Sequence, residues 1–247
     1  MIIPAYHCSI DDVFDAFIEV SDRRLPLFDH PFFRFLKEAH DEFGTNVSLY
    51  LFYQKKIRDR IRTLAEVSET NTETLRENRW LQFGPHALDY ETPPHAQSLA
   101  EQITAFDAIY TEIERFAGGG ISKWVRLHYF SESYELAEYF RTKGVEALLS
   151  TDKAAVSYRL PAYAKEQLSD KGIVNYKGMT FVRSHLRVET LVRDISPRNV
   201  HRAIEPLLPH PGRVVVLTHE YELALPEVRA MAVAMLRYLK TRGVGSC

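Results

Sequence analysis

The sequence predicts an α/β protein in which βα units surround a mostly parallel sheet. Short apolar runs rich in β-branched and aromatic residues alternate with longer segments of helical period. Polar residues gather directly after the predicted strands, where the active sites of parallel α/β proteins form. The length of 247 residues suits one barrel or two small domains.

The candidate elements follow from the hydrophobic periodicity and from Gly and Pro residues at the boundaries. The predicted strands are 2–10, 46–53, 80–86, 124–130, 146–150 and 213–219. The predicted helices have apolar residues every three or four positions, and they are 31–43, 98–116, 133–143, 197–208 and 226–242. Two short runs between 172 and 192 flank Lys177-Gly178 and predict a β-hairpin insertion. The basic run at 55–60 is expected to be the solvated face of a helix.

Composition excludes several classes of protein. The 31 basic and 33 acidic residues nearly cancel, so there is no basic field for a nucleic-acid partner. Cys8 and Cys247 are the only cysteines, too few for a disulfide framework or a cysteine zinc cluster. No run of 18 apolar residues and no signal-peptide pattern occurs, so we expect a cytoplasmic protein without a membrane partner.

Ionisable side chains at the strand ends are the candidate functional residues. If they converge on one mouth, residues 1–247 form a single barrel domain, because two independent domains could not share it. Any metal there would be held by oxygen and imidazole ligands. The strand-end groups are Asp11, Asp12, His86, Arg126, His128, His219 and Glu220.

The acidic pair Asp11-Asp12 has two interpretations. Neighbouring side chains on a strand point opposite ways, so one carboxylate could face an ion while the other takes a different role. Alternatively, an aspartate caps a helix over 13–20 by accepting backbone N–H bonds. A cap needs only one acid, so capping alone does not explain the pair.

His86 is expected in a loop after an aromatic strand and a Gly-Pro pair. Its neutral imidazole could bind a divalent metal, or it could be an ordinary hydrogen-bonded loop histidine. Nearby side chains that could complete a metal shell are Asp89, Tyr90, Glu91 and His95.

The remaining candidates lie on two other strands. His219 ends the most hydrophobic strand and is either a general acid or base, or a structural histidine. Arg126 and His128 alternate with Leu127, so both are expected to face the interior. A buried arginine needs an acidic partner, for which Asp11 is a candidate.

Taken in order, these motifs resemble the polysaccharide deacetylase family. Residues 9–13 (SIDDV) are similar to its T-F-D-D-G motif, and 84–90 (GPHALDY) to part of its G-N-H-T-x-x-H loop. Residues 126–130 (RLHYF) resemble R-x-P-x-G, and 217–219 (LTH) match L-x-H. The chain departs from these patterns at Tyr90, where the family has its second metal histidine, and at Val13, His128 and Phe130.

The resemblance implies a distorted (β/α) barrel that binds a divalent metal, expected to be zinc. It implies Asp11 as general base, Arg126 as the residue that orients it, and His219 as general acid. It implies Asp12 and His86 as metal ligands, and the third ligand is left open. The candidates for it are Asp89, Tyr90, Glu91, His95 and His128.

Three functions follow as hypotheses. The first is a metal-dependent hydrolase that removes an acyl group from an amide or ester on a sugar or another small molecule. The second is a non-catalytic protein that binds a carbohydrate or small molecule on the same barrel and has lost the complete metal site, which Tyr90 favours. In the third, the acids and histidines are caps and core groups of an unrelated α/β fold.

Overall fold

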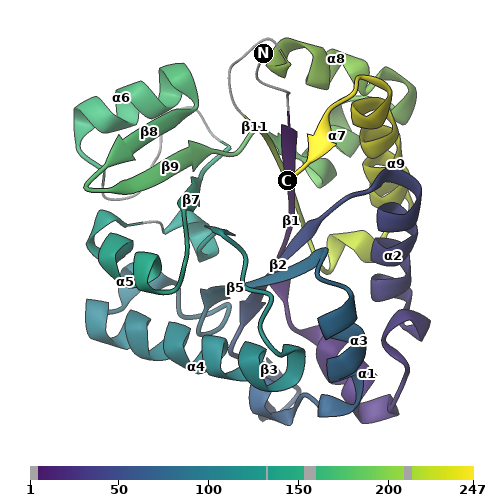
Figure 1. Ribbon diagram of the computed structural model, residues 1–247, viewed down its shortest axis with the longest axis vertical. Coiled ribbons are helices and arrows are strands. Elements are labelled where there is room, and N and C mark those ends of the chain that lie inside the picture. Colours follow the sequence, from purple (N-terminus) through teal and green to yellow (C-terminus); the bar gives the residue numbers. More distant parts are fainter. Residues whose placement is uncertain (1–4, 132, 153–159, 209–212) are drawn as a thin grey trace.

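The computed structural model describes residues 5–131, 133–152, 160–208 and 213–247 (Figure 1). Residues 2–4 of the first predicted strand lie outside these ranges. The strands are β1 (Ala5–Val13), β2 (Val47–Phe52), β3 (Gln54–Ile57), β4 (Arg60–Thr63), β5 (Leu81–Ala87), β6 (Trp124–Val125), β7 (Ala147–Ser150), β8 (Ile173–Tyr176), β9 (Met179–Arg183), β10 (Leu186–Arg187), β11 (Arg213–His219) and β12 (Gly245–Ser246).

Helices follow most of these strands and pack outside them. Figure 1 shows α2 and α9 along one flank and α4 along another. The helices are α1 (Asp15–Arg23), α2 (Pro31–Phe43), α3 (Thr72–Glu77), α4 (Leu99–Ala117), α5 (Ala137–Thr142), α6 (Ala162–Lys171), α7 (Val188–Asp194), α8 (His201–Ile204) and α9 (Pro226–Thr241). Among the described residues, no helix has the length and apolar character needed to cross a membrane.

Two curved sheets face each other to form the barrel. One has the order β10-β11-β1-β2-β5, with β12 beside β1, and the other has the order β6-β7-β9-β8. Backbone hydrogen bonds join them at both edges: Phe83 bonds to Gly120 and Ser122 at 2.8 Å, and the His185 N–H donates to the Val215 carbonyl at 2.9 Å. Except for β3–β4 and β8–β9, the strand pairs are parallel, as predicted.

Side chains alternate between the barrel interior and the helices. On β1, Tyr6 and Ile10 join the main core beneath the helices, whereas His7 and Asp11 contact interior groups. A small second core from the facing strands fills part of the interior, and its members are Tyr50, Ala147, Leu149, Val182 and Val215. The barrel is therefore packed below a polar upper layer.

Two predicted segments differ from the structure. The hairpin near 172–192 is present as β8–β9, but β9 also pairs in parallel with β7, so it is a strand of the barrel itself. Residues 187–192, at its end, include the start of α7. The basic run at 55–60 is wrong as a helix, because Gln54–Thr63 forms the β3–β4 hairpin. In this hairpin Lys55 pairs with Arg62, whose guanidinium bonds to Asp22 at 2.9 Å.

Two other predicted elements are shorter than expected. The strand at 124–130 stops at Val125, because the chain turns into a 3-10 segment at His128–Phe130. The helix at 197–208 is broken into short pieces around α8, and Pro206 within that stretch lacks the N–H that a continuous helix needs. The single-domain organisation stays a prediction.

Candidate active site

A β-bulge directs both Asp11 and Asp12 to the carboxyl end of the barrel. Ile10 pairs with Leu49 and Val13 with Leu51, so the two aspartates together oppose one residue of β2. Asp12 has a φ of 60°, a left-handed conformation that aspartate tolerates better than most residues. The expected opposite orientation is therefore wrong, since both side chains line the same cleft.

His86 also lies at a bulge, within β5 and not in the loop that we expected. Leu51 pairs with Pro85 and Phe52 with Ala87, which leaves His86 as the extra residue. Pro85 has no N–H to contribute to a ladder, and prolines inside sheets are found at such irregularities. The bulge points the imidazole into the cleft, where it is buried.

His128 reaches the same point from a tight turn after β6. Tyr129 and Phe130 have φ values of 54° and 52°, and this left-handed pair turns the chain directly after His128. Phe130 stands where the family motif has glycine, the residue that adopts this conformation without steric cost. The His128 ring is buried against Phe52 and His86.

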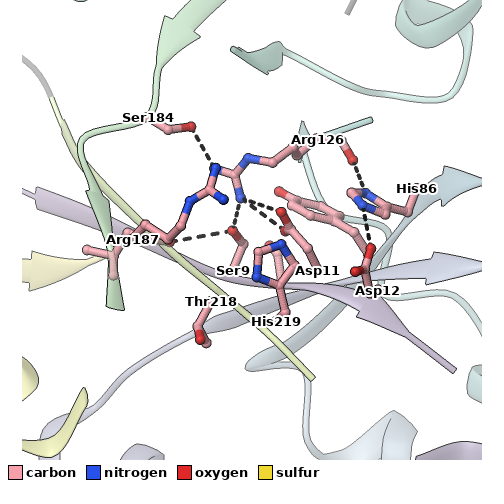
Figure 2. A network of polar contacts seen from close by, with 12 residues as sticks. Ser9, Asp11, Asp12, His86, Arg126, Ser184, Arg187, Thr218 and His219 are labelled. Atoms are coloured by element: carbon pink, nitrogen blue, oxygen red, sulfur yellow. Dashed lines mark hydrogen bonds and ion pairs between the residues drawn. The ribbon is translucent and has the colours of Figure 1, made fainter. Parts of the chain in front are cut away.

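Three side chains converge here on one point. Oδ1 of Asp12 lies 3.1 Å from Nε2 of His86 and 3.4 Å from Nδ1 of His128, and the two ring nitrogens are 3.3 Å apart. Figure 2 shows His86 between Asp12 and the Arg126 carbonyl. Within the described residues, these three form the group whose ligand atoms lie close enough to hold a metal ion.

Hydrogen bonds on the far sides of the rings assign the tautomers. Nδ1 of His86 lies 2.8 Å from the Arg126 carbonyl, and Nε2 of His128 lies 3.3 Å from the Tyr90 carbonyl. A carbonyl only accepts, so these nitrogens carry the hydrogens. In the neutral rings, the other nitrogens present lone pairs to Asp12, as metal-ligating histidines do.

The carboxylate and the rings fit a cation. Burial lowers the pKa of His128, which favours its neutral form. In the described part of the chain, Oδ1 of Asp12 is buried with no hydrogen-bond partner. Three acceptors, one of them this unsatisfied oxygen, make a site that a divalent ion would complete.

Asp11 and Arg126 form a buried ion pair beside this group, as predicted. Nη1 of Arg126 lies 3.1 Å from Oδ1 of Asp11 and also donates to Ser9 Oγ at 2.6 Å, while Nη2 donates to Ser184 Oγ at 2.9 Å (Figure 2). The arginine side chain is only 1% exposed. These contacts fix the guanidinium and, through it, the Asp11 carboxylate.

His219 faces the cleft from β11, with Glu189 behind it. Its Nδ1 lies 2.7 Å from Oε1 of Glu189, whose Oε2 accepts from Thr218 Oγ1 at 2.9 Å. Burial lowers the pKa of His219, but Glu189 and Asp11 outweigh burial and raise it above its ordinary value. Sequence reasoning missed Glu189, because the stretch 172–192 was predicted as a β-hairpin insertion. In the structure Glu189 lies just after β10, beside the end of β11.

Among the described residues, the other acidic and histidine candidates for a third ligand, Asp89, Glu91 and His95, do not belong to the converging group. Asp89 accepts hydrogen bonds from Gln54 Nε2 at 2.8 Å and from the Thr92 N–H at 2.7 Å. Nδ1 of His95 lies 3.0 Å from Ser131 Oγ. Tyr90 presents its carbonyl to His128 and an exposed ring to the cleft, and Glu91 lines an adjoining hollow.

The alternative role of the aspartates as helix caps is also absent. The N-terminus of α1 is capped by Glu220, which accepts from three backbone N–H groups, those of Phe14, Asp15 and Ala16. All of the converging groups line one cleft of about 560 Å³ at the carboxyl end of the strands. Its walls include the aromatic side chains of Tyr90, Tyr129, Phe130 and Tyr221.

Comparison with known proteins shows similarity in structure. No family model and no curated protein sequence matches the chain. The peptidoglycan N-acetylglucosamine deacetylase Bc1960 matches 98% of this chain and 85% of its own, with 11% identity and a TM-score of 0.53. Peptidoglycan deacetylase PdaC from Bacillus subtilis matches 99% and 87%, with 12% identity and a TM-score of 0.51.

A third structure has a different activity. The 4-alpha-glucanotransferase from Thermococcus litoralis matches 100% of this chain but only 37% of its own, with 15% identity and a TM-score of 0.60. The predicted fold is thus confirmed: the chain has the distorted α/β barrel of the polysaccharide deacetylases. Since this fold also carries a glucanotransferase, the function has to be argued from the site.

Proposed function

We propose that the protein is a metal-dependent hydrolase that removes an acyl group from an amide or ester on a sugar or another small molecule. The observation that carries the proposal is the convergence of Asp12 Oδ1, His86 Nε2 and His128 Nδ1 in a cleft that also holds Asp11 and His219. Three protein ligands with an open side are typical of catalytic zinc sites. His128, on the turn after β6, would thus take the place of the family histidine that Tyr90 replaces.

The chain's own groups fit the steps of acyl transfer. When bound, a zinc ion would supply a Lewis acid for the acyl oxygen and lower the pKa of water. Asp11 removes a proton from the attacking water, and Arg126 holds its carboxylate in place. His219, with its raised pKa, donates a proton to the leaving nitrogen or oxygen, and Glu189 holds its tautomer.

A sugar derivative is the first substrate class to test. Two of the structures that match this chain are named as peptidoglycan deacetylases, and one of those was solved with an N-hydroxybenzamide. The aromatic rings on the cleft walls suit the apolar faces of a pyranose. The alternative, a barrel that binds a carbohydrate or small molecule without catalysis, predicts binding that a chelator does not change.

The test is hydrolysis of N-acetylglucosamine oligomers and of p-nitrophenyl acetate by the zinc-loaded protein. We expect activity that a chelator abolishes and zinc restores. Asp11→Asn and His219→Ala should each lower kcat by about 100-fold or more while zinc content stays unchanged. Activity that is equal with and without chelator, or activity in both variants that equals that of the native protein, would overturn the proposal. Chelator-insensitive sugar binding without turnover would favour the alternative.

A further inference from the structure

We propose that Glu220 is a positioning residue, which holds the Asp11–Asp12 bulge in the shape that the metal group requires. This inference rests on the proposed function. Oε2 of Glu220 accepts from the Phe14 N–H at 2.6 Å and the Asp15 N–H at 3.1 Å, and Oε1 accepts from the Ala16 N–H at 2.5 Å. Its own N–H donates to the Asp11 carbonyl at 3.0 Å.

These contacts give α1 a cap from the far end of the chain. Phe14, the residue at the cap position, has no oxygen in its side chain, so the first N–H groups of α1 need an outside acceptor. A carboxylate is the favoured acceptor there because it also meets the positive end of the helix dipole. Glu220, the residue directly after β11, is this acceptor.

Glu220 bonds to the chain on both sides of Asp12, the candidate metal ligand. Glu220 bonds to the residue before Asp12 through its backbone and to the residues from Phe14 onward through its side chain. Between these anchors, Asp12 adopts its φ of 60° and the ladder to β2 slips by one residue. Without the Glu220 hydrogen bonds, we expect Asp12 to adopt an extended conformation, which would turn its carboxylate away from His86.

Glu220 also joins the two halves of the site. It follows His219, the candidate general acid, so one residue ties the end of β11 to the end of β1 and to α1. An ordinary cap would stabilise α1 only. A positioning residue would also set the affinity for metal, because ligands in the wrong place bind weakly.

The test compares Glu220→Gln with Ser98→Ala. Gln keeps the shape but turns an amide NH₂ toward N–H donors, whereas Ser98 caps α4 and its side chain contacts Glu101. We expect both variants to lower the midpoint of unfolding, but only Glu220→Gln to weaken zinc binding, by about 10-fold or more in competition with a chromophoric chelator. Glu220→Asp, which keeps the charge but is one methylene shorter, should fall between Gln and the native protein.

Unchanged zinc affinity in Glu220→Gln, with the native protein binding zinc, would overturn the inference and leave the proposed function standing. If the native protein binds no zinc, the proposed function fails, and the metal-free protein still tests the inference. There we expect the imidazole ¹⁵N shifts of His86 and His128 to move in Glu220→Gln and not in Ser98→Ala. Identical shifts in all three proteins would contradict the positioning role.

Discussion

Oδ1 of Asp12 lies 3.1 Å from Nε2 of His86, a nitrogen left without a hydrogen because the ring donates to Arg126 from its other side. Two acceptors at this distance repel each other unless a cation or a proton lies between them. The chain thus keeps an arrangement that is unfavourable without a ligand. Functional sites commonly have such locally unfavourable features.

Asp12→Asn should therefore stabilise the metal-free protein and remove its response to zinc. The Asn NH₂ can donate to Nε2 of His86, which replaces a repulsion with a hydrogen bond of about 1 kcal/mol. Urea unfolding in chelator and in zinc measures both effects. Asp89→Asn, at an acid that bonds elsewhere, should keep the response to zinc. A destabilised Asp12→Asn protein in chelator would contradict this view of the pair.

Glu189→Gln should lower the pKa of His219 and shift the alkaline limb of the activity profile to lower pH. The folded-state pKa of His219 is raised above its ordinary 6.5, so the pair's contribution to stability is complete below pH 6.5 and is lost as pH rises through the raised value. The pKa of Glu189 is lowered from 4.5: burial raises it, but the bond to His219 outweighs burial. On the acid side, the contribution is lost as pH falls through that lowered pKa.

The loss of stability in Glu189→Gln should therefore be largest between pH 4.5 and 6.5 and smaller at pH 9. Denaturant unfolding at these pH values provides the measurement. Glu146→Gln, which breaks the exposed pair with Lys123, is the control. A pH profile of activity that does not move would argue against His219 as the general acid.

Arg126→Met should destabilise the protein by about 3–5 kcal/mol, because it leaves the Asp11 carboxylate buried without its partner. Arg237→Met is the matched control, since it breaks an exposed pair with Glu42 and should cost about 0–1 kcal/mol. Urea titrations of both variants give the comparison. Equal losses would mean that the Asp11–Arg126 pair is not held away from water.

The turn after His128 should tolerate Tyr129→Asn. Tyr129 is 56% exposed and has a φ of 54°, and asparagine adopts this left-handed conformation at less cost. Tyr163 is similarly exposed but lies in α6. We expect Tyr129→Asn to be more stable than Tyr163→Asn by about 1 kcal/mol in thermal unfolding. The reverse order would show that the Tyr129 ring contributes more than its backbone strain costs.

Sequence patterns predicted the strands that hold the candidate site, because each run is apolar and ends in ionisable residues. They missed the bulges at Asp12 and His86, since a slip of one residue depends on how β1, β2 and β5 pair. The polar β3–β4 hairpin was predicted as a helix face because so short a run of charged residues fits the helical and the strand period alike.

The third ligand could not be chosen from spacing. Candidates between Asp89 and His95 are closer in sequence to His86 than His128 is, but proximity in space follows from the left-handed turn at Tyr129 and Phe130. Glu189 and Glu220 were missed as partners for the same reason. Each bonds to a group beside the neighbouring strand of the order β10-β11-β1, but at least 30 residues away in the chain.

The metal content of His128→Ala tests the central claim most directly. The native protein, purified with zinc and dialysed, should hold about one equivalent, and His128→Ala should hold less than about a tenth of that, because two ligands do not retain the ion. His95→Ala, which removes another histidine of the cleft, should match the native protein. Equal zinc in all three proteins, or none in the native one, would contradict the account.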